Sequence, residues 1–278
     1  MRRVPRAPLG GGAPVRLGST GLHYACPVPE PEQIAFARPD ATRVHREVVS
    51  FVRRSARMNP SQRKAWDAWR GSRVVEVERR ETTTSVADQP PVDWTGVFGR
   101  EAELCVEIGS GTGETLAALA VARPEANIIG FEVFEPAMAS TLSRLARAGI
   151  DNVRLVQADA AQGMLHLFEP SSITELFTFF PDPWHKTRHH KRRLVSPGFA
   201  EVVASRLVPG GLWRLATDWD DYAEWMREVL DVAEGLENVH AADGGWAPRL
   251  DARPVTNFEA KGLRAGRTIR DLTYRRLP

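Results

Sequence analysis

Short apolar runs alternate with amphipathic stretches from residue 104 onward. Five runs predict buried strands, over residues 104–108, 127–133, 153–157, 174–180 and 212–217. The three-to-four-residue spacing of apolar positions between and after them predicts helices, over residues 114–121, 136–148, 161–168, 199–207 and 219–234. Strands that alternate with helices predict an α/β fold whose mostly parallel sheet carries helices on both faces.

The N-terminal part of the chain has a different pattern. Residues 1–47 contain a Gly-Gly-Gly triplet, several prolines and few periodic apolar positions, with four arginines and no acid in residues 1–20. Its early prolines and glycines would break the amphipathic helix of a transit peptide. We therefore expect residues 1–47 to be a disordered basic arm and residues 48–278 to form a single domain.

Two shorter segments separate the arm from the first strand. Residues 61–70 read as a helix, with Ser61 as a possible cap after Pro60. Residues 80–101 read as a loop. The pattern predicts no further element ahead of residue 104.

Composition restricts the class of protein. A chain of 278 residues with two cysteines has no disulfide framework, which indicates a reducing compartment and a cytoplasmic location. No apolar run reaches the length of a transmembrane helix, so we expect no contact with a membrane. Neither cysteine belongs to a Cys-x-x-Cys pair, and we expect no metal and no obligate protein partner.

The net charge of +2 conceals an uneven distribution. Residues 184–193 hold five lysines or arginines and no acid, and residues 253–278 hold seven basic and two acidic residues. Residues 218–237 hold eight acids and one arginine. Local basic zones in a nearly neutral chain favour a polyanion at one face, although ordinary solvated charge gives the same counts.

A glycine turn follows the first strand directly. Gly109, Gly111 and Gly113 allow a sharp turn and a close approach of a ligand, which in open α/β sheets binds at the carboxyl ends of the strands. Glu114 stands where a dinucleotide-binding loop has its third glycine, and its carboxylate would repel a pyrophosphate. The loop also lacks the Lys-Ser/Thr of a P-loop, so a nucleoside ligand without phosphate fits better.

Three acids at successive strand ends point to the same ligand. Glu107 can favour a cationic ligand. Glu132 can accept hydrogen bonds from both hydroxyls of a ribose, and Asp159 can accept one from the amino group of an adenine. S-adenosylmethionine carries all three groups, so we predict it as the cofactor. Each acid alone has a plain alternative, since a strand-end acid often caps a helix.

A rigid loop follows the fourth strand. Asp182 lies between two prolines, which fix the direction of its carboxylate and of Trp184. A basic run comes next and offers a surface to phosphates: Lys186, Arg188, Lys191, Arg192 and Arg193. The adjacent histidines of this run lack the spacing and the carboxylate of a metal site.

These motifs together resemble those of the bacterial tRNA (guanine-N7)-methyltransferases, from about residue 49 to residue 276. The Pro-Asp-Pro-Trp-x-Lys and Thr-x-Phe-Glu motifs are specific to that family, whereas many methyltransferases share the glycine loop. The matching segments are Phe51–Met58, the glycine loop, Phe180–Lys186, Lys191–Leu194, Ala216–Asp218 and Pro254–Glu259.

The resemblance implies a class I, Rossmann-like methyltransferase with a seven-stranded sheet that methylates N7 of a guanine in the tRNA variable loop, at position 46 in tRNA numbering. It implies four cofactor-pocket acids, Glu107, Glu132, Asp159 and Asp182, with Asp182 also catalytic. It implies tRNA contacts by Lys186, Asp218, Thr256, Asn257, Phe258 and Glu259. Asn257 departs from the family, where a cation is commoner.

Two other functions use the same fold. A methyltransferase for a small molecule or an amino group would leave the basic run unexplained. A non-catalytic RNA-binding protein would have lost the cofactor pocket, but the glycine loop and the acids are intact.

Overall fold

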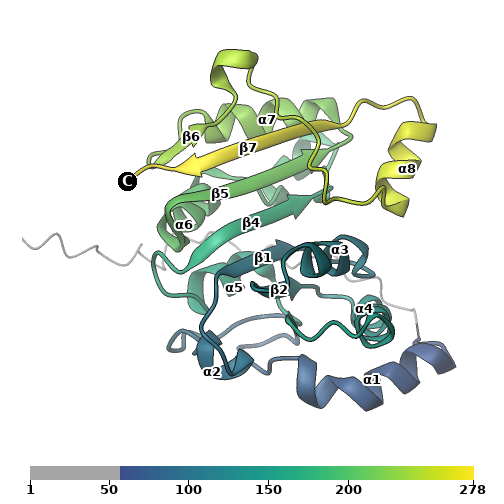
Figure 1. The fold of residues 1–278 in the computed structure, drawn as a ribbon. Coiled ribbons are helices and arrows are strands. Elements are labelled where there is room, and N and C mark those ends of the chain that lie inside the picture. The colour runs from purple at the N-terminus through teal and green to yellow at the C-terminus, as the bar shows by residue number, and fades with distance from the viewer. Residues whose placement is uncertain (1–56) are drawn as a thin grey trace, which may run out of the picture. The chain divides into compact units, whose positions relative to one another are not determined.

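The computed structural model describes residues 57–278, and the predicted arm, residues 1–47, lies outside that range together with most of the Phe51–Met58 motif. The described part contains a seven-stranded sheet in the order β3-β2-β1-β4-β5-β7-β6 (Figure 1). The strands are β1 (Leu104–Ile108), β2 (Asn127–Phe131), β3 (Val153–Val156), β4 (Ile173–Phe179), β5 (Leu207–Thr217), β6 (Leu236–Asn238) and β7 (Arg270–Arg276).

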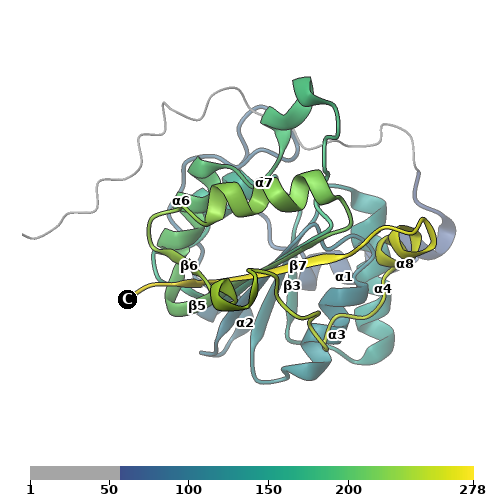
Figure 2. The same ribbon diagram turned by 90° about the horizontal axis from the view of Figure 1, so that it is seen from above.

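Helices cover both faces of the sheet, as the view from above shows (Figure 2). They are α1 (Pro60–Arg73), α2 (Trp94–Phe98), α3 (Glu114–Ala122), α4 (Glu135–Ala148), α5 (Ala160–His166), α6 (Pro197–Arg206), α7 (Asp220–Leu230) and α8 (Asn257–Arg264). In residues 57–278 no helix combines the length and the apolar character needed to cross a membrane. The predicted α/β class and the helices on both faces are confirmed.

Two hydrophobic cores lie on opposite faces of the sheet, because successive side chains of a strand point in opposite directions. Leu104, Val106 and Ile108 of β1 belong to the core that contains side chains of α2, α5, α6 and α7. Cys105 belongs to the other core, which contains side chains of α1, α3 and α4. Glu107 therefore faces the side of α3 and α4.

Several elements differ from the expectations. Asn59, not Ser61, caps α1, since its side chain accepts from Gln62 N while the Gln62 side chain accepts from Asn59 N. The short helix α2 lies in the segment read as a loop. Strand β5 begins at Leu207, so the Pro-Gly-Gly expected to precede it lies inside it, opposite an irregularity in β4. The pattern did not predict β6, β7 or α8.

Strand direction determines where the site lies. The strands β1 to β5 run parallel, so their carboxyl ends meet at one edge of the sheet. Strand β7 is antiparallel to β5, with Arg270 opposite Thr217. The beginning of β7 and the preceding helix α8 therefore reach the same edge from the C-terminal part of the chain.

Candidate functional site

The acids singled out in the sequence lie at this carboxyl edge. Glu107 is in β1, and Glu132 directly follows β2. Asp159 follows β3, Asp182 follows β4 and Asp218 directly follows β5. Parallel strands therefore bring together five acids that are far apart in the sequence.

The glycine loop is tied to the end of β2. Gly109 N and Ser110 N both donate to Phe131 O, each at 2.9 Å. A Cβ added at Gly109 would meet no atom within 4 Å, and one added at Gly111 would meet only Gly109 O, at 3.9 Å. The outer surface of the loop is thus open, so a ligand can lie directly against its backbone.

Gly113 has a different role from the other two glycines. Its φ is 74°, and an added Cβ would lie 2.5 Å from Thr141 Cγ2 on α4. The close approach of the loop to α4 therefore requires glycine here. Packing accounts for this residue, which the sequence analysis had assigned to the cofactor.

Glu107 is buried at the base of the loop with 4% of its surface exposed. Its Oε2 atom has no hydrogen-bond partner among the described residues. Burial, and secondly the charge of Glu132, raise the pKa of Glu107 to about 8. An unpartnered buried carboxyl is costly by itself and suits a ligand that brings a positive charge or N–H donors.

Glu132 holds the glycine loop and the start of the following helix. Its Oε2 accepts from Gly111 N, and its Oε1 accepts from Val133 N and Phe134 N, all at 2.8 Å. Burial raises the pKa of Glu132, and these backbone donors oppose the rise. A carboxylate can accept about four hydrogen bonds, so capacity remains for a ligand hydroxyl.

Asp159 caps α5. Its Oδ1 accepts from Ala161 N at 3.0 Å and from Gln162 N at 3.2 Å. Its own N–H donates to Thr84 O at 2.7 Å, which brings the buried residues Thr84 and Ser85 next to the site. The sequence pattern of that segment indicated only a loop, because nothing local signals a contact with residue 159.

The loop that carries Asp182 is bounded by two residues with unusual backbone angles. Phe180 has a φ of 52° and Trp184 a φ of 45°, in the left-handed region that non-glycine residues seldom adopt. Asp182 itself is exposed, and partial desolvation by the surrounding protein raises its pKa. The charge of Asp182 also contributes to the raised pKa of Glu132. The strands that precede these two acids, β2 and β4, both pair with β1.

Arg253 joins this loop to α8 and β7. It is 1% exposed and donates to both carboxylate oxygens of Asp271, at 2.5 and 3.1 Å. Its guanidinium carbon lies 4.9 Å from the ring centroid of Phe179 and 5.5 Å from that of Phe180. Arg253 could not be singled out from the sequence, because an isolated arginine in a basic segment looks like a surface cation.

Glu259 belongs to the same ion-pair cluster. It accepts from Arg249 at 2.8 and 3.1 Å and from Arg253 at 3.4 Å, and these contacts lower its pKa against the effect of burial. Asp218 pairs with Arg267 at 2.8 Å. Both carboxylates, expected to contact guanine, are thus already engaged by arginines.

The segment that precedes Glu259 shows one internal contact and two exposed side chains. Thr256 Oγ1 accepts from Glu259 N at 3.3 Å and caps α8. Asn257 and Phe258 are exposed, with 68% of the Phe258 surface accessible. Of the predicted tRNA contacts in this segment, these two are the ones open to a partner.

The basic run forms a 3₁₀ helix over Thr187–Arg192. Four of its five cations are exposed, namely Lys186, Arg188, Lys191 and Arg192. Arg193 is buried, with 4% of its surface accessible. Within residues 57–278 no group of three or more His, Cys, Asp or Glu has the arrangement of a metal site.

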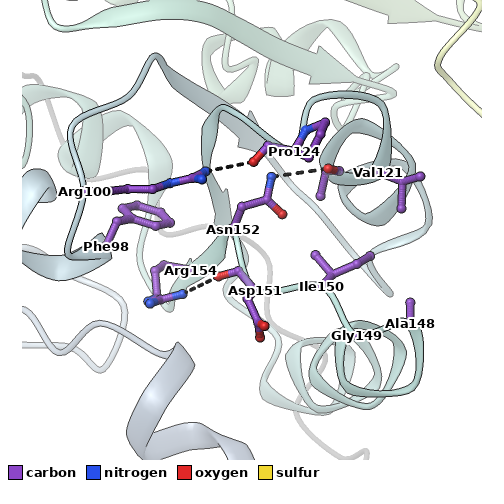
Figure 3. Close-up of a pocket in the computed structure, with 11 residues that line it drawn as sticks. Phe98, Arg100, Val121, Pro124, Ala148, Gly149, Ile150, Asp151, Asn152 and Arg154 are labelled. Atoms are coloured by element: carbon purple, nitrogen blue, oxygen red, sulfur yellow. Dashed lines mark hydrogen bonds between the residues drawn. The ribbon is translucent and has the colours of Figure 1, made fainter.

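A pocket at the opposite edge of the sheet is distinct from this site (Figure 3). It lies among the segments that precede β1, β2 and β3, and Phe98, Arg100, Pro124, Asn152 and Arg154 line it. Its polar groups are satisfied internally, since Arg100 donates to Pro124 O and Asn152 to Ala126 O. None of the acids at the carboxyl edge contributes to it.

Comparisons with known proteins show the family of this chain. A family model described as "Putative methyltransferase" matches residues 101–272. A tRNA (guanine-N(7)-)-methyltransferase from Cutibacterium acnes is 55% identical over 88% of this chain and 89% of its own, and one from a Nocardioides species is 49% identical over 88% and 96%. The solved 16S rRNA methyltransferase KamB has a TM-score of 0.46 at 18% identity, over 74% of this chain and 99% of its own. The chain belongs to the tRNA (guanine-N7)-methyltransferase family.

Proposed function

We propose that this protein transfers the methyl group of S-adenosylmethionine to N7 of a guanine in tRNA, at position 46 of the variable loop. One observation carries the proposal: the Asp182 loop follows β4, the strand that pairs with β1 and its Glu107, and leads directly into the exposed cations Lys186, Arg188, Lys191 and Arg192. A cofactor pocket, a rigid carboxylate and a phosphate-binding surface are thus adjacent. Membership of the family supports the same reaction.

The cofactor pocket suits a cationic nucleoside. The open glycine loop can accept the ligand against its backbone, and the unpartnered Oε2 of Glu107 can accept from its ammonium group. Glu132 has acceptor capacity for a ribose hydroxyl, and Asp159 lies at the next strand end for the adenine. When bound, S-adenosylmethionine supplies an electrophilic methyl group on its sulfonium.

Guanine N7 carries an in-plane lone pair and no proton, so its methylation requires no general base. The protein can act by orientation and electrostatics. Asp182 is exposed at the mouth of the pocket, where its carboxylate can accept from guanine N1–H and N2–H. The methylated ring gains positive charge, which the same carboxylate stabilises. Catalysis therefore depends on the direction in which the loop holds Asp182.

The tRNA backbone is the expected partner of the exposed cations. Phosphate contacts position a nucleic acid without reading its sequence. Lys186, Arg188, Lys191 and Arg192 are suited to this role because their side chains are accessible. Arg193 is buried, so we withdraw it from the phosphate-binding set.

The expected cytoplasmic location rests on the cysteine count and on where tRNA is modified.

The direct test incubates purified protein with labelled S-adenosylmethionine and unmodified tRNA, followed by nucleoside analysis. We expect 7-methylguanosine from a transcript with G46 and none from the matched transcript with A46. Equal labelling of both transcripts would reject the position, and a different labelled nucleoside would reject the N7 atom. The absence of label from every tRNA nucleoside would reject tRNA as the substrate.

A further inference from the structure

Arg193 ends the basic run, yet its surroundings differ from those of its neighbours. Its side chain is 1% exposed, whereas Lys191 and Arg192 are exposed. Its guanidinium carbon lies 4.8 Å from the ring centroid of Tyr222 and 5.9 Å from that of Trp225, both on α7. A cation in such a position cannot reach a phosphate without leaving two aromatic rings.

The donors of Arg193 are directed at the catalytic loop and at α7. Its Nε donates to the carbonyl oxygen of Pro183 at 3.0 Å, one residue after Asp182. Its Nη2 donates to the Asp221 carboxylate and lies 3.2 Å from His190 Nε2. One buried side chain thus links the backbone beside Asp182 to a helix that packs on the sheet.

Further contacts hold the same segment on α7. Trp225 Nε1 donates to Val195 O at 2.8 Å, and the Tyr222 hydroxyl accepts from Val195 N at 3.2 Å. Residues 193–195 are therefore anchored through both backbone and side chain. This fixed segment gives Arg193 a stable base from which to hold Pro183.

The loop needs such external support. The left-handed angles of Phe180 and Trp184 are unfavourable for residues other than glycine and persist only where surrounding contacts enforce them. Arg253 packs against the Phe180 ring at one end of the loop. At the other end, Arg193 holds the carbonyl that precedes Trp184.

We propose that Arg193 is a positioning residue, which fixes the direction of Asp182 through the Pro183 carbonyl instead of binding tRNA phosphate. The expected fall in kcat rests on the proposed methyl transfer, whereas the effect of Arg193 on the Asp182 loop does not. A variant in which the Asp182 carboxylate is misdirected would bind tRNA as before, because the exposed cations remain. Its carboxylate would stabilise the transition state of methyl transfer less. Displacements of about 1 Å at a reacting group can cost roughly a hundredfold in rate.

The test compares Arg193→Gln with the exposed neighbour Lys191→Gln and with Arg275→Gln, which loses only a surface ion pair with Glu237. For Arg193→Gln we expect kcat to fall by roughly a hundredfold, with KM for tRNA and the salt dependence of binding unchanged. For Lys191→Gln we expect weaker and less salt-dependent tRNA binding, without faster exchange in the Asp182 loop. Arg275→Gln should match the parent in kcat, in KM and in the salt dependence of binding.

Hydrogen exchange gives a readout that needs no activity. The amides of residues 180–186 should exchange faster in Arg193→Gln than in the parent, at similar melting temperature. A variant with parental kcat, parental exchange and weakened tRNA binding would overturn the proposal. If the parent methylates no tRNA, the proposed function fails, while faster exchange would still support the role of Arg193 in the loop.

Asp221→Asn resolves the case in which Arg193→Gln does not fold. Asp221 is 60% exposed, so its substitution should be tolerated while it removes the charged partner of Arg193. We expect an intermediate loss of kcat and intermediate exchange in residues 180–186. Parental values of both in Asp221→Asn would count against the proposal.

Discussion

Glu132 Oε2 accepts a hydrogen bond from Gly111 N at 2.8 Å, so the acid after β2 fixes the loop after β1. The same carboxylate is the proposed ribose acceptor. One side chain therefore shapes the cofactor site and contributes to it, which makes Glu132 the most informative position for a binding test.

We expect Glu132→Ala to weaken S-adenosylmethionine binding by roughly 1–3 kcal/mol, the usual cost of a lost charged hydrogen-bond partner. Titration calorimetry measures this change. The exposed acid Glu125, changed to Gln, serves as the control and should bind as the parent does. Parental affinity in Glu132→Ala would remove this residue from the pocket.

The raised pKa of Glu107 predicts a pH-dependent affinity. Below about pH 8 this carboxyl is mostly protonated in the free protein, and a cationic ligand favours its ionised form. Binding therefore releases a proton, and affinity should increase from pH 6 to 8 by at most about tenfold per unit. Calorimetry in two buffers of different ionisation enthalpy detects the released proton.

Glu107→Gln is the matched variant for this effect, since it keeps the shape and cannot ionise. Its affinity should be lower at pH 8 and depend less on pH. The same pH slope in the variant and the parent would show that another group, in the protein or the ligand, takes part in the linkage.

Asp182→Ala should lose most methyl transfer while the protein stays folded. Removal of one preorganised electrostatic contact costs about 3–4 kcal/mol, or roughly a hundred- to a thousandfold in rate. Asp182→Asn keeps the shape and removes the charge, so it separates orientation from charge stabilisation. Single-turnover assays measure the step. A near-parental rate in Asp182→Ala would move the catalytic role to another residue.

The exposed cations predict a salt effect. Lys191→Gln combined with Arg192→Gln should reduce the slope of log affinity against log salt by up to about 0.9 for each lost contact with duplex tRNA. Binding titrations from low to high salt give the slope. An unchanged slope would identify the run as an ordinary solvated surface.

We expect Gly113→Ala to lower the free energy of unfolding, because the added methyl group would clash with Thr141. Gly149→Ala is the control, because Gly149 also has a left-handed φ, of 64°, but no atom within 4 Å of an added Cβ. Both variants should lose about 1–2 kcal/mol for the backbone, and Gly113→Ala about 1–3 kcal/mol more for the clash with Thr141. Chemical unfolding measures the difference, and equal losses would contradict the packing role.

The fold was predictable where burial is encoded locally. Strands β1 and β4 are short, mostly buried runs rich in apolar residues, and the structure has them within one residue of the predicted bounds. Strand β7 was missed because arginines occupy both of its ends and because its buried Asp271 pairs with Arg253, which lies 18 residues away. Pairing across such a separation leaves no periodic signal.

The candidate site was predictable to a similar extent. Strand-end acids and glycine turns follow from local rules, so Glu107 and Glu132 could be selected as pocket residues. Whether an arginine side chain is exposed or buried could not be predicted from such local rules. Arg192 and Arg193 are adjacent and chemically identical, yet one is exposed and the other lies between rings of α7. Only the position of that helix distinguishes them.

The antiparallel direction of β7 affects the order in which the site can form during synthesis. Translation produces the segments with Glu107, Glu132 and Asp182 well before Asp271, the carboxylate that neutralises Arg253. A nascent chain that ends after β5 would thus contain the acids proposed for the cofactor but would lack both Arg253 and Asp271, the ion pair that lies against the Phe180 ring. The substrate side of the site is therefore the last to mature, so an incomplete chain could hold the methyl donor before it could methylate RNA.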